Sequence, residues 1–187
     1  MTKKEVKVKK VSLEVIVPDN VESTIKGNEV SMKGPEGEVI RSFRLRVSTM
    51  KQEGKKIIIE SQKDKKKDRK EAGAIQAHLK NMIRGSQEAH KYVMKICSGH
   101  FPMNVAIVGT KLVIKNFLGE KVPRTVELKA GAKVKVEGEH INISSVNKEI
   151  AGQVAADIEQ ITRRPKFDTR IFQDGIYIIH KDGEDLK

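Results

Sequence analysis

The chain has 187 residues, of which 37% are hydrophobic, 33% are charged and only 4% are aromatic, with a formal net charge of +12. This length suits one large or two small domains, and the charge favours a polyanionic partner, with solubility alone as the alternative. The single cysteine, Cys97, excludes an intrachain disulfide and a cysteine-based zinc site, and no histidine pair has zinc-ligand spacing, so we expect no metal and no cofactor.

Targeting and membrane segments are not evident. No apolar run approaches the ~20 residues that a membrane helix needs, and the first ten residues, MTKKEVKVKK, lack the apolar core of a secretory signal. The glycine loops KGPEGE and KNFLGE do not have the spacing of nucleotide-binding loops. We therefore expect a cytoplasmic protein with no membrane partner and no small-molecule substrate.

In the first half, a charged segment, residues 1–10, precedes an alternating strand at 11–17. A two-residue Gly27-Asn28 turn predicts a hairpin, and the loop after it is Gly34–Gly37. Longer and shorter strands are predicted at 39–47, with Phe43, Leu45 and Val47 on one face, and at 57–59. The lysine-rich run Lys63–Lys70 is interpreted as a solvated loop with occasional phosphate contacts, followed by an amphipathic helix over 72–83 that ends at Gly85.

The second half follows the same order. Strands are predicted at 92–97, at 105–108 and 111–115 around a Gly109-Thr110 turn, and at 122–128, 141–143 and 176–179. A helix precedes the last strand, with Ile150, Val154, Ile158 and Ile161 on one face and Ser144 or Ser145 as its N-cap.

The two halves repeat each other. Gly27 and Gly109 stand 82 residues apart, and the same offset relates Lys33 to Lys115, Gly37 to Gly119 and Glu38 to Glu120. The helices match at an offset of 79, as in Leu79 and Ile158. Strands come first and the helix last in each copy. The sequence therefore predicts an α+β fold of two tandem duplicated domains, residues 1–85 and 86–187, each a small, mainly antiparallel sheet covered by one helix.

A basic segment follows the second helix and is our main candidate binding site. Arg163 and Arg164 are expected at the helix end, Pro165 stops the helix, and Lys166 and Arg170 follow in an extended segment. Arginine binds phosphate in bidentate fashion, so we expect these cations to grip an RNA backbone. The alternative is a solvated helix end. Total charge favours the first half, with 21 Lys and Arg against 13 Asp and Glu in residues 1–90, yet only the second half presents its arginines on an ordered edge.

Two other functions compete with RNA binding. Cys97 and His100 suggest a reactive pair in a regulatory or enzyme domain, although we expect the thiol to be passive and the protein to have no enzymatic activity. The second alternative is an RNA- or protein-binding scaffold that uses its exposed sheets.

Several stretches in order resemble the universal large-subunit ribosomal protein six family, in its archaeal and eukaryotic branch. They are VSMKGPEG from Val30, HFPMN from His100, KNFLGEK from Lys115, GQVAADI from Gly152 and FQDGIY from Phe172. The resemblance covers nearly the whole chain, and the VPDNV stretch and the absence of tryptophan favour an archaeal member.

The resemblance implies a structural constituent of the large subunit that binds rRNA mainly through its second domain. It also implies a place near the sarcin–ricin loop and stalk base, next to neighbouring ribosomal proteins and to the docking site of translational GTPases. Carried over by position, the rRNA-facing residues are Arg163, Arg164, Lys166, Phe167, Thr169 and Arg170, with weaker candidates at His100, Phe101, Lys115, Asn116, Lys121 and Arg124. The bacterial proteins of the family have a Gly/Lys-rich loop where this chain has PKFDTRIFQDG.

Overall fold

The computed structural model describes residues 11–61, 64–168 and 170–186. The chain divides between Glu88 and Ala89 into two compact units, and each is described by itself. The charged lead-in 1–10, Lys63 of the lysine-rich run and Thr169 of the candidate site lie outside the described residues.

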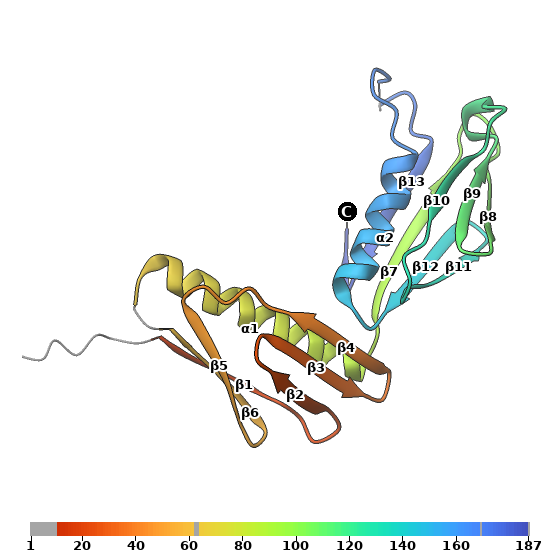
Figure 1. Cartoon of the computed structure of the whole chain (residues 1–187). Coiled ribbons are helices and arrows are strands. Elements are labelled where there is room, and N and C mark those ends of the chain that lie inside the picture. Colours follow the sequence, from red (N-terminus) through yellow and green to blue (C-terminus); the bar gives the residue numbers. More distant parts are fainter. Residues whose placement is uncertain (1–10, 62–63, 169, 187) are drawn as a thin grey trace, which may run out of the picture. The chain divides into compact units, whose positions relative to one another are not determined.

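The first unit contains six strands in two three-stranded sheets, with the orders β1-β6-β5 and β2-β3-β4, and one helix (Figure 1). Every pairing is antiparallel. The elements are β1 Ser12–Ile16, β2 Glu22–Lys26, β3 Glu29–Gly34, β4 Gly37–Ser42, β5 Ser48–Glu53, β6 Lys56–Ser61 and α1 Lys66–Gln87.

The core of the first unit forms where α1 packs on strands of both sheets. Apolar residues of α1 recur at helical spacing and are buried, among them Ile75 and Leu79. They meet alternating strand residues such as Met32 on β3 and Ile59 on β6, both 0% exposed. The opposite face of α1 is left mainly to charged residues.

The second unit has a three-stranded sheet of order β10-β9-β8, a five-stranded sheet of order β11-β12-β7-β13-β14, and one long helix (Figure 1). Its pairings are also antiparallel. The elements are β7 His90–Cys97, β8 Asn104–Val108, β9 Lys111–Lys115, η1 Phe117–Gly119, β10 Arg124–Glu127, β11 Lys133–Glu137, β12 His140–Ser145, α2 Lys148–Ile161, β13 Gly175–Lys181 and β14 Glu184–Asp185.

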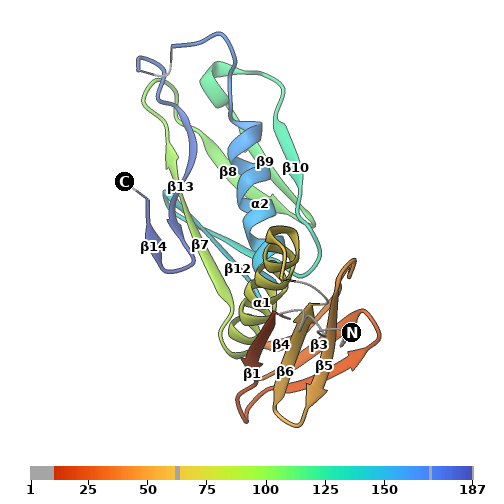
Figure 2. The same ribbon diagram turned by 90° about the vertical axis from the view of Figure 1, so that its left-hand side faces the viewer.

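The duplication is visible strand by strand. The sheet β1-β6-β5 of the first unit corresponds to β7-β12-β11 of the second, and β2-β3-β4 corresponds to β8-β9-β10. The second unit adds β13 and β14 at the free side of β7. In Figures 1 and 2, α2 lies against its strands, and its contacts are with β7, β10, β12 and β13. The prediction of two tandem α+β repeats is confirmed, with the sheet of each unit split into two.

Several local predictions were wrong. The strand predicted over 39–47 ends at Ser42, and a separate strand, β5, begins at Ser48. The first helix does not end at Gly85 but runs to Gln87, and it begins at Lys66, inside the run interpreted as a loop. Lysine is a good helix former, and Asp68 of that run is buried, which explains the extension.

The start of α2 was also assigned to the wrong residue. Asn147 is its N-cap, and the Asn147 side chain accepts a hydrogen bond from the backbone N–H of Glu149. The hydroxyl of Ser145 instead donates to the backbone carbonyl of Gly131, at 2.7 Å. The cap is therefore supplied two residues later than expected, with the geometry typical of asparagine.

Candidate nucleic-acid interface

Three connections meet at one end of the second unit. They are the β7–β8 loop, residues 98–103, the β9–β10 loop, residues 116–123, and the segment from the end of α2 to β13, residues 162–174. We call the last segment the basic tongue. In Figure 1 the tongue and the loop that contains η1 lie at the same end of this unit. Side-chain contacts join the three connections to one another and to α2.

The first end of the tongue is anchored by Thr162, which is buried at the C-cap of α2. Its hydroxyl donates to the backbone carbonyl of Glu159, at 2.9 Å, and accepts from the backbone N–H of Ile176, at 3.1 Å. One hydroxyl thus ties the end of α2 to β13. The helix ends at Ile161, so the prediction that Arg163 and Arg164 form its end, directly before Pro165, was wrong.

The second end of the tongue is anchored by Asp174, whose side chain is 2% exposed. Its carboxylate accepts from the backbone N–H groups of Gly99 and His100, at 2.7 and 2.9 Å, and is 2.5 Å from Nδ1 of His100. Burial raises the pKa of this carboxyl, but the hydrogen bonds from His100 and Gly99 more than offset it, so the pKa of Asp174 lies below its usual value. The β7–β8 loop is therefore held to the tongue by a charged group.

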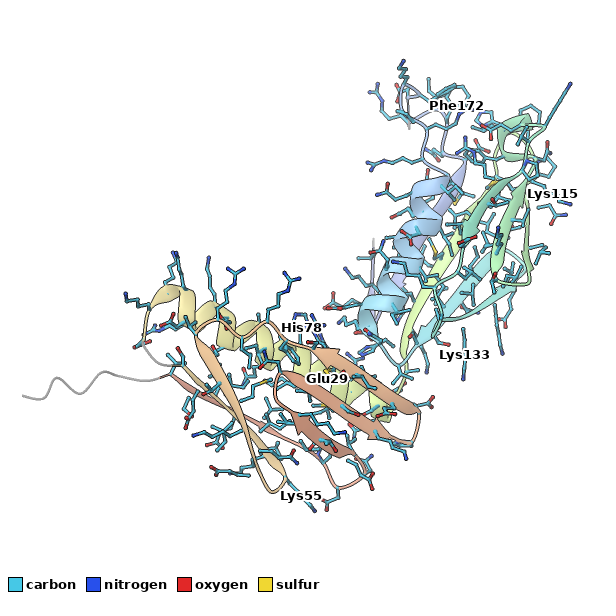
Figure 3. All side chains as sticks on the ribbon, in the orientation of Figure 1. Glu29, Lys55, His78, Lys115, Lys133 and Phe172 are labelled. Atoms are coloured by element: carbon cyan, nitrogen blue, oxygen red, sulfur yellow. The ribbon has the colours of Figure 1, made fainter. Side chains whose placement is uncertain are left out.

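Ring contacts fill the space between these anchors. The His100 ring stacks on Phe172, with centroids 5.1 Å apart, and Phe172 meets Phe167 edge to face at 5.2 Å. The guanidinium of Arg164 lies over the Phe167 ring, 4.1 Å from its centroid. We call these four side chains the ring stack. It runs from His100 of the β7–β8 loop to Phe172 in the second part of the tongue, and on to Phe167 and Arg164 in its first part. Figure 3 shows Phe172 at this end of the unit.

Of the four cations predicted for the tongue, Arg164 is part of the ring stack and the other three lie outside it. Arg163, Lys166 and Arg170 are exposed, whereas Arg164 is half-buried against Phe167. Lys166 adopts a left-handed backbone, with φ of 77°. Arg170 pairs with Asp168 at 2.8 Å, and its side chain remains 88% exposed. This pair lies in solvent, so it restrains Arg170 only weakly.

Arg124 has a different environment from the other predicted residues. It donates through Nε and Nη2 to the two carboxylate oxygens of Glu120, both at 2.7 Å, and through Nη1 to the carbonyl of Ile161, and it lies 4.4 Å from the Phe117 ring centroid. The hydrogen bond from Arg124 holds the pKa of Glu120 below its usual value, and the charges of Arg124 and Arg164 act in the same direction. Arg124 therefore fastens the β9–β10 loop to the end of α2.

The remaining predicted residues lie on the other two connections. Phe101 is 48% exposed, and its ring lies next to Gly119, where an added β-carbon would be 3.8 Å from the nearest ring atom. Asn116, with φ of 58°, donates to the Pro102 carbonyl at 3.0 Å. Lys115 is the last residue of β9 and Lys121 lies within the β9–β10 loop, and both are exposed. A surface depression of about 640 Å³ is lined in part by Pro102, Lys115 and Asn116.

Sequence reasoning missed the residues that build this end. Thr162 and Asp174 carry no local pattern, because their partners are distant in sequence or are backbone groups, whereas Asp168 pairs with Arg170 only two residues away. Phe172 and Asp174 stand within the FQDGIY stretch quoted for the family resemblance, but nothing in that stretch names His100 as their partner.

The alternative of a Cys97–His100 reactive pair has no support in the geometry. The contacts described for the His100 ring are to Asp174 and Phe172. Cys97 is half-buried at the end of β7, where it pairs with Gly175. Among the described residues there is no cluster of three metal-ligating side chains, and no described helix has the length and apolar character that crossing a membrane requires.

Comparison with known proteins agrees with this architecture. The family model of ribosomal protein L6 matches residues 17–89 and again 101–175, one match in each unit. The large ribosomal subunit protein uL6 of Methanococcus vannielii is 42% identical over 173 residues, 92% of this chain and 95% of that protein. The uL6 protein of Methanobrevibacter smithii is 41% identical over 90% of this chain and 95% of its own length. The uL6 protein of Natronomonas pharaonis is also 41% identical, over 88% of this chain and 93% of its own length. This chain belongs to the ribosomal protein L6 family, in its archaeal branch.

Proposed function

We propose that this protein is a structural, non-enzymatic constituent of the large ribosomal subunit, and that it binds rRNA of that subunit through the loop end of its second unit. The membership in the L6 family supports the ribosomal role. The observation that carries the RNA-binding site is the construction of the basic tongue, in which exposed cations stand on an anchored ring stack.

The tongue suits phosphate better than it suits an acidic protein surface. Arg163, Lys166 and Arg170 are exposed within eight residues of chain, and their common base is fixed through Thr162 and Asp174. A fixed base means that little loop ordering remains to oppose binding. Phosphate contacts of this kind set the position of a protein on RNA, and each one releases counterions.

Recognition in this proposal is of RNA shape rather than of sequence. Phe101 and Phe167 are the large rings exposed at this end, 48% and 41% respectively. They can stack on an unpaired base, while Lys115 and Lys121 extend the positive surface along the β9–β10 loop. Arg164 stabilises this surface through its contact with the Phe167 ring, and Arg124 stabilises it through its hydrogen bonds to Glu120.

The central test is a binding titration of the whole protein with protein-free large-subunit rRNA at several salt concentrations. The triple substitution Arg163→Ala, Lys166→Ala and Arg170→Ala should weaken binding and reduce the slope of log K against log salt by roughly two to three. The matched control removes three exposed lysines of the first unit, Lys26, Lys33 and Lys55, to give the same net charge. Equal effects of the two triple variants would refute the site.

The place of the protein in the subunit is a finer part of the proposal. We place the loop end near the sarcin–ricin loop and stalk base, beside neighbouring ribosomal proteins and where translational GTPases dock, on the strength of the family resemblance. A cleavage probe can test this. With Cys97→Ser and Lys166→Cys, an iron–EDTA group attached at position 166 should cut rRNA in the sarcin–ricin region of reconstituted subunits. Cuts confined to other regions would contradict the placement.

A further inference from the structure

A second positive surface lies on the first unit, on α1 and on the adjacent β4–β5 connection. Residues 41–47 and 64–84 contain ten Lys and Arg against three Asp and Glu. The second-unit surface proposed above uses none of these residues. Figure 3 shows their side chains along the outer side of α1, in the neighbourhood of His78.

The three acids of these segments do little to cancel the positive charge. Asp68 is 5% exposed. The Glu71 carboxylate accepts from the backbone N–H groups of Arg46 and Val47, at 2.8 and 3.3 Å. Asp64 holds Arg69 through two hydrogen bonds, at 2.5 and 2.8 Å. Each acid is thus turned to the fold or to a single arginine, and most of the remaining cations, Arg44, Arg46, Lys66, Lys70 and Lys80 among them, are exposed.

Helical periodicity places several of those cations on one stripe. Lys66, Lys70 and Lys80 are exposed. They are separated by four and ten residues, and at 3.6 residues a turn each lies within about 40° of one line drawn along the helix surface. The stripe spans roughly 21 Å at 1.5 Å a residue. Between Lys70 and Lys80 the same face carries only Gly73 and Ala77. Because Gly73 and Ala77 are small, a phosphate backbone can approach α1 closely between Lys70 and Lys80.

The β4–β5 connection adds a second row beside this stripe. The Phe43 ring lies 6.3 Å from the His78 ring, and the Arg41 guanidinium is 3.3 Å from Nε2 of His78. Together with the hydrogen bonds to Glu71, these contacts hold the connection along α1, as Figure 1 shows. Arg44 and Arg46 are exposed on it. The surface therefore has two supporting elements, and its two rows of cations can meet more than one phosphate.

The chemistry of this surface favours a nucleic acid over a protein. Among the described residues, no large hydrophobic side chain within 41–47 or 64–84 is exposed. Protein interfaces usually have an apolar centre, whereas a phosphate backbone can be bound by cations and other hydrogen-bond donors without one. We propose that the outer face of α1, with Arg44 and Arg46, is a second RNA-binding surface that contacts the phosphate backbone of large-subunit rRNA. This inference rests on the proposed ribosomal role only for the identity of the bound polyanion, which we take to be RNA.

The test is the same titration with the whole protein and protein-free large-subunit rRNA, now with Lys66→Ala, Lys70→Ala and Lys80→Ala combined. Binding should weaken on the order of tenfold, and the salt slope should fall by roughly two to three. The single charge reversal Lys70→Glu should weaken binding more than Lys70→Ala does. Alanine is an excellent helix former, so the triple variant is expected to fold, which a thermal unfolding curve checks.

The control is again the Lys26, Lys33 and Lys55 triple variant, and Figure 3 shows Lys55 on the side of the first unit away from α1. An α1 variant that binds like this control would overturn the proposal and leave the tongue unaffected. A tongue variant that binds like the control, with a weakened α1 variant, would overturn only the second-unit site. Additive losses in the combined variant support both surfaces.

Discussion

Phe167 and Phe172 meet edge to face across the basic tongue, with centroids 5.2 Å apart and ring planes at 87°. Phe167 carries Arg164 on its face, and Phe172 stacks on His100 of the β7–β8 loop. The pair therefore joins the first part of the tongue, at Phe167, to its second part, at Phe172, and joins both to the β7–β8 loop. The position of the cations depends on these rings, although the rings bear no charge.

Replacing Phe172 by alanine should release the tongue without changing the charge of the protein. Edge-to-face pairs contribute about 0.5–1.5 kcal/mol beyond the area they bury, and Phe172 takes part in two ring contacts. We expect weaker rRNA binding and faster tryptic cleavage after Lys166 and Arg170, read by mass spectrometry of the fragments. Phe101→Ala, at the same end but outside the ring stack, should leave the cleavage rate unchanged, and equal rates in all three proteins would contradict this role.

Asp174→Asn should destabilise the second unit at neutral pH. The amide has one acceptor oxygen in place of two and no charge to offer the His100 ring, and a buried charge-assisted hydrogen bond that is lost costs about 1–3 kcal/mol. Calorimetric unfolding of the two proteins at pH 7 measures the difference. Asp168→Asn is the matched control, because Asp168 is exposed and pairs with Arg170 in solvent.

The same variant makes a prediction about pH. The pKa of Asp174 is lower in the folded protein than its usual value, so its stabilising effect is fully present above the unfolded pKa of about 3.9 and is lost as pH falls through the folded pKa. The stability difference between the native protein and Asp174→Asn should therefore shrink as pH falls below about pH 4. A difference that persists or grows below about pH 4 would show that the carboxylate is not the stabilising form.

The extent to which the sequence predicts this fold differs between elements. The duplication and both glycine turns were predictable because apolar alternation and two-residue turns are local patterns, as at Gly27 and Gly109, whose φ angles are both 62°. Strand β5, STMKQE, lacks apolar alternation because four of its six residues are exposed and the one buried residue is Ser48. Strand β11, KVKVE, does alternate, and its hairpin turn at Gly138 could have been recognised.

The candidate site was predictable in composition but not in construction. Arginines and lysines after the second helix stand out in the sequence, and most of them are exposed as expected. The surface beneath them depends on contacts between groups far apart in sequence, such as Asp174 with His100 and Ile176 with Thr162. Such contacts follow from the tertiary fold. Arg124 is the clearest case, since a cation that looks like a phosphate ligand in sequence is bound to Glu120 in the structure.

The two helix glycines at equivalent positions of the repeat should respond differently to alanine. A β-carbon at Gly73 would meet nothing within 4 Å, whereas at Gly152 it would lie 3.2 Å from the Tyr92 hydroxyl oxygen. Gly73→Ala should therefore stabilise the first unit by about 0.5–1 kcal/mol through helix propensity, and Gly152→Ala should gain less or lose stability in the second. Chemical denaturation of both variants measures this. Equal gains would mean that Tyr92 moves aside at no cost.

Arg124→Met separates an anchoring role from a phosphate contact. Methionine keeps apolar contact with Phe117 but removes the hydrogen bonds to Glu120 and Ile161, and a half-buried Glu120 carboxylate left without its partner costs about 1–3 kcal/mol. We expect a lower melting temperature and looser rRNA binding with an unchanged salt slope, because the number of phosphates contacted stays the same. The double variant with Glu120→Gln should recover part of the stability. A salt slope reduced by about one would instead place Arg124 on a phosphate, and the β9–β10 loop would then have to open its pair with Glu120 when RNA binds.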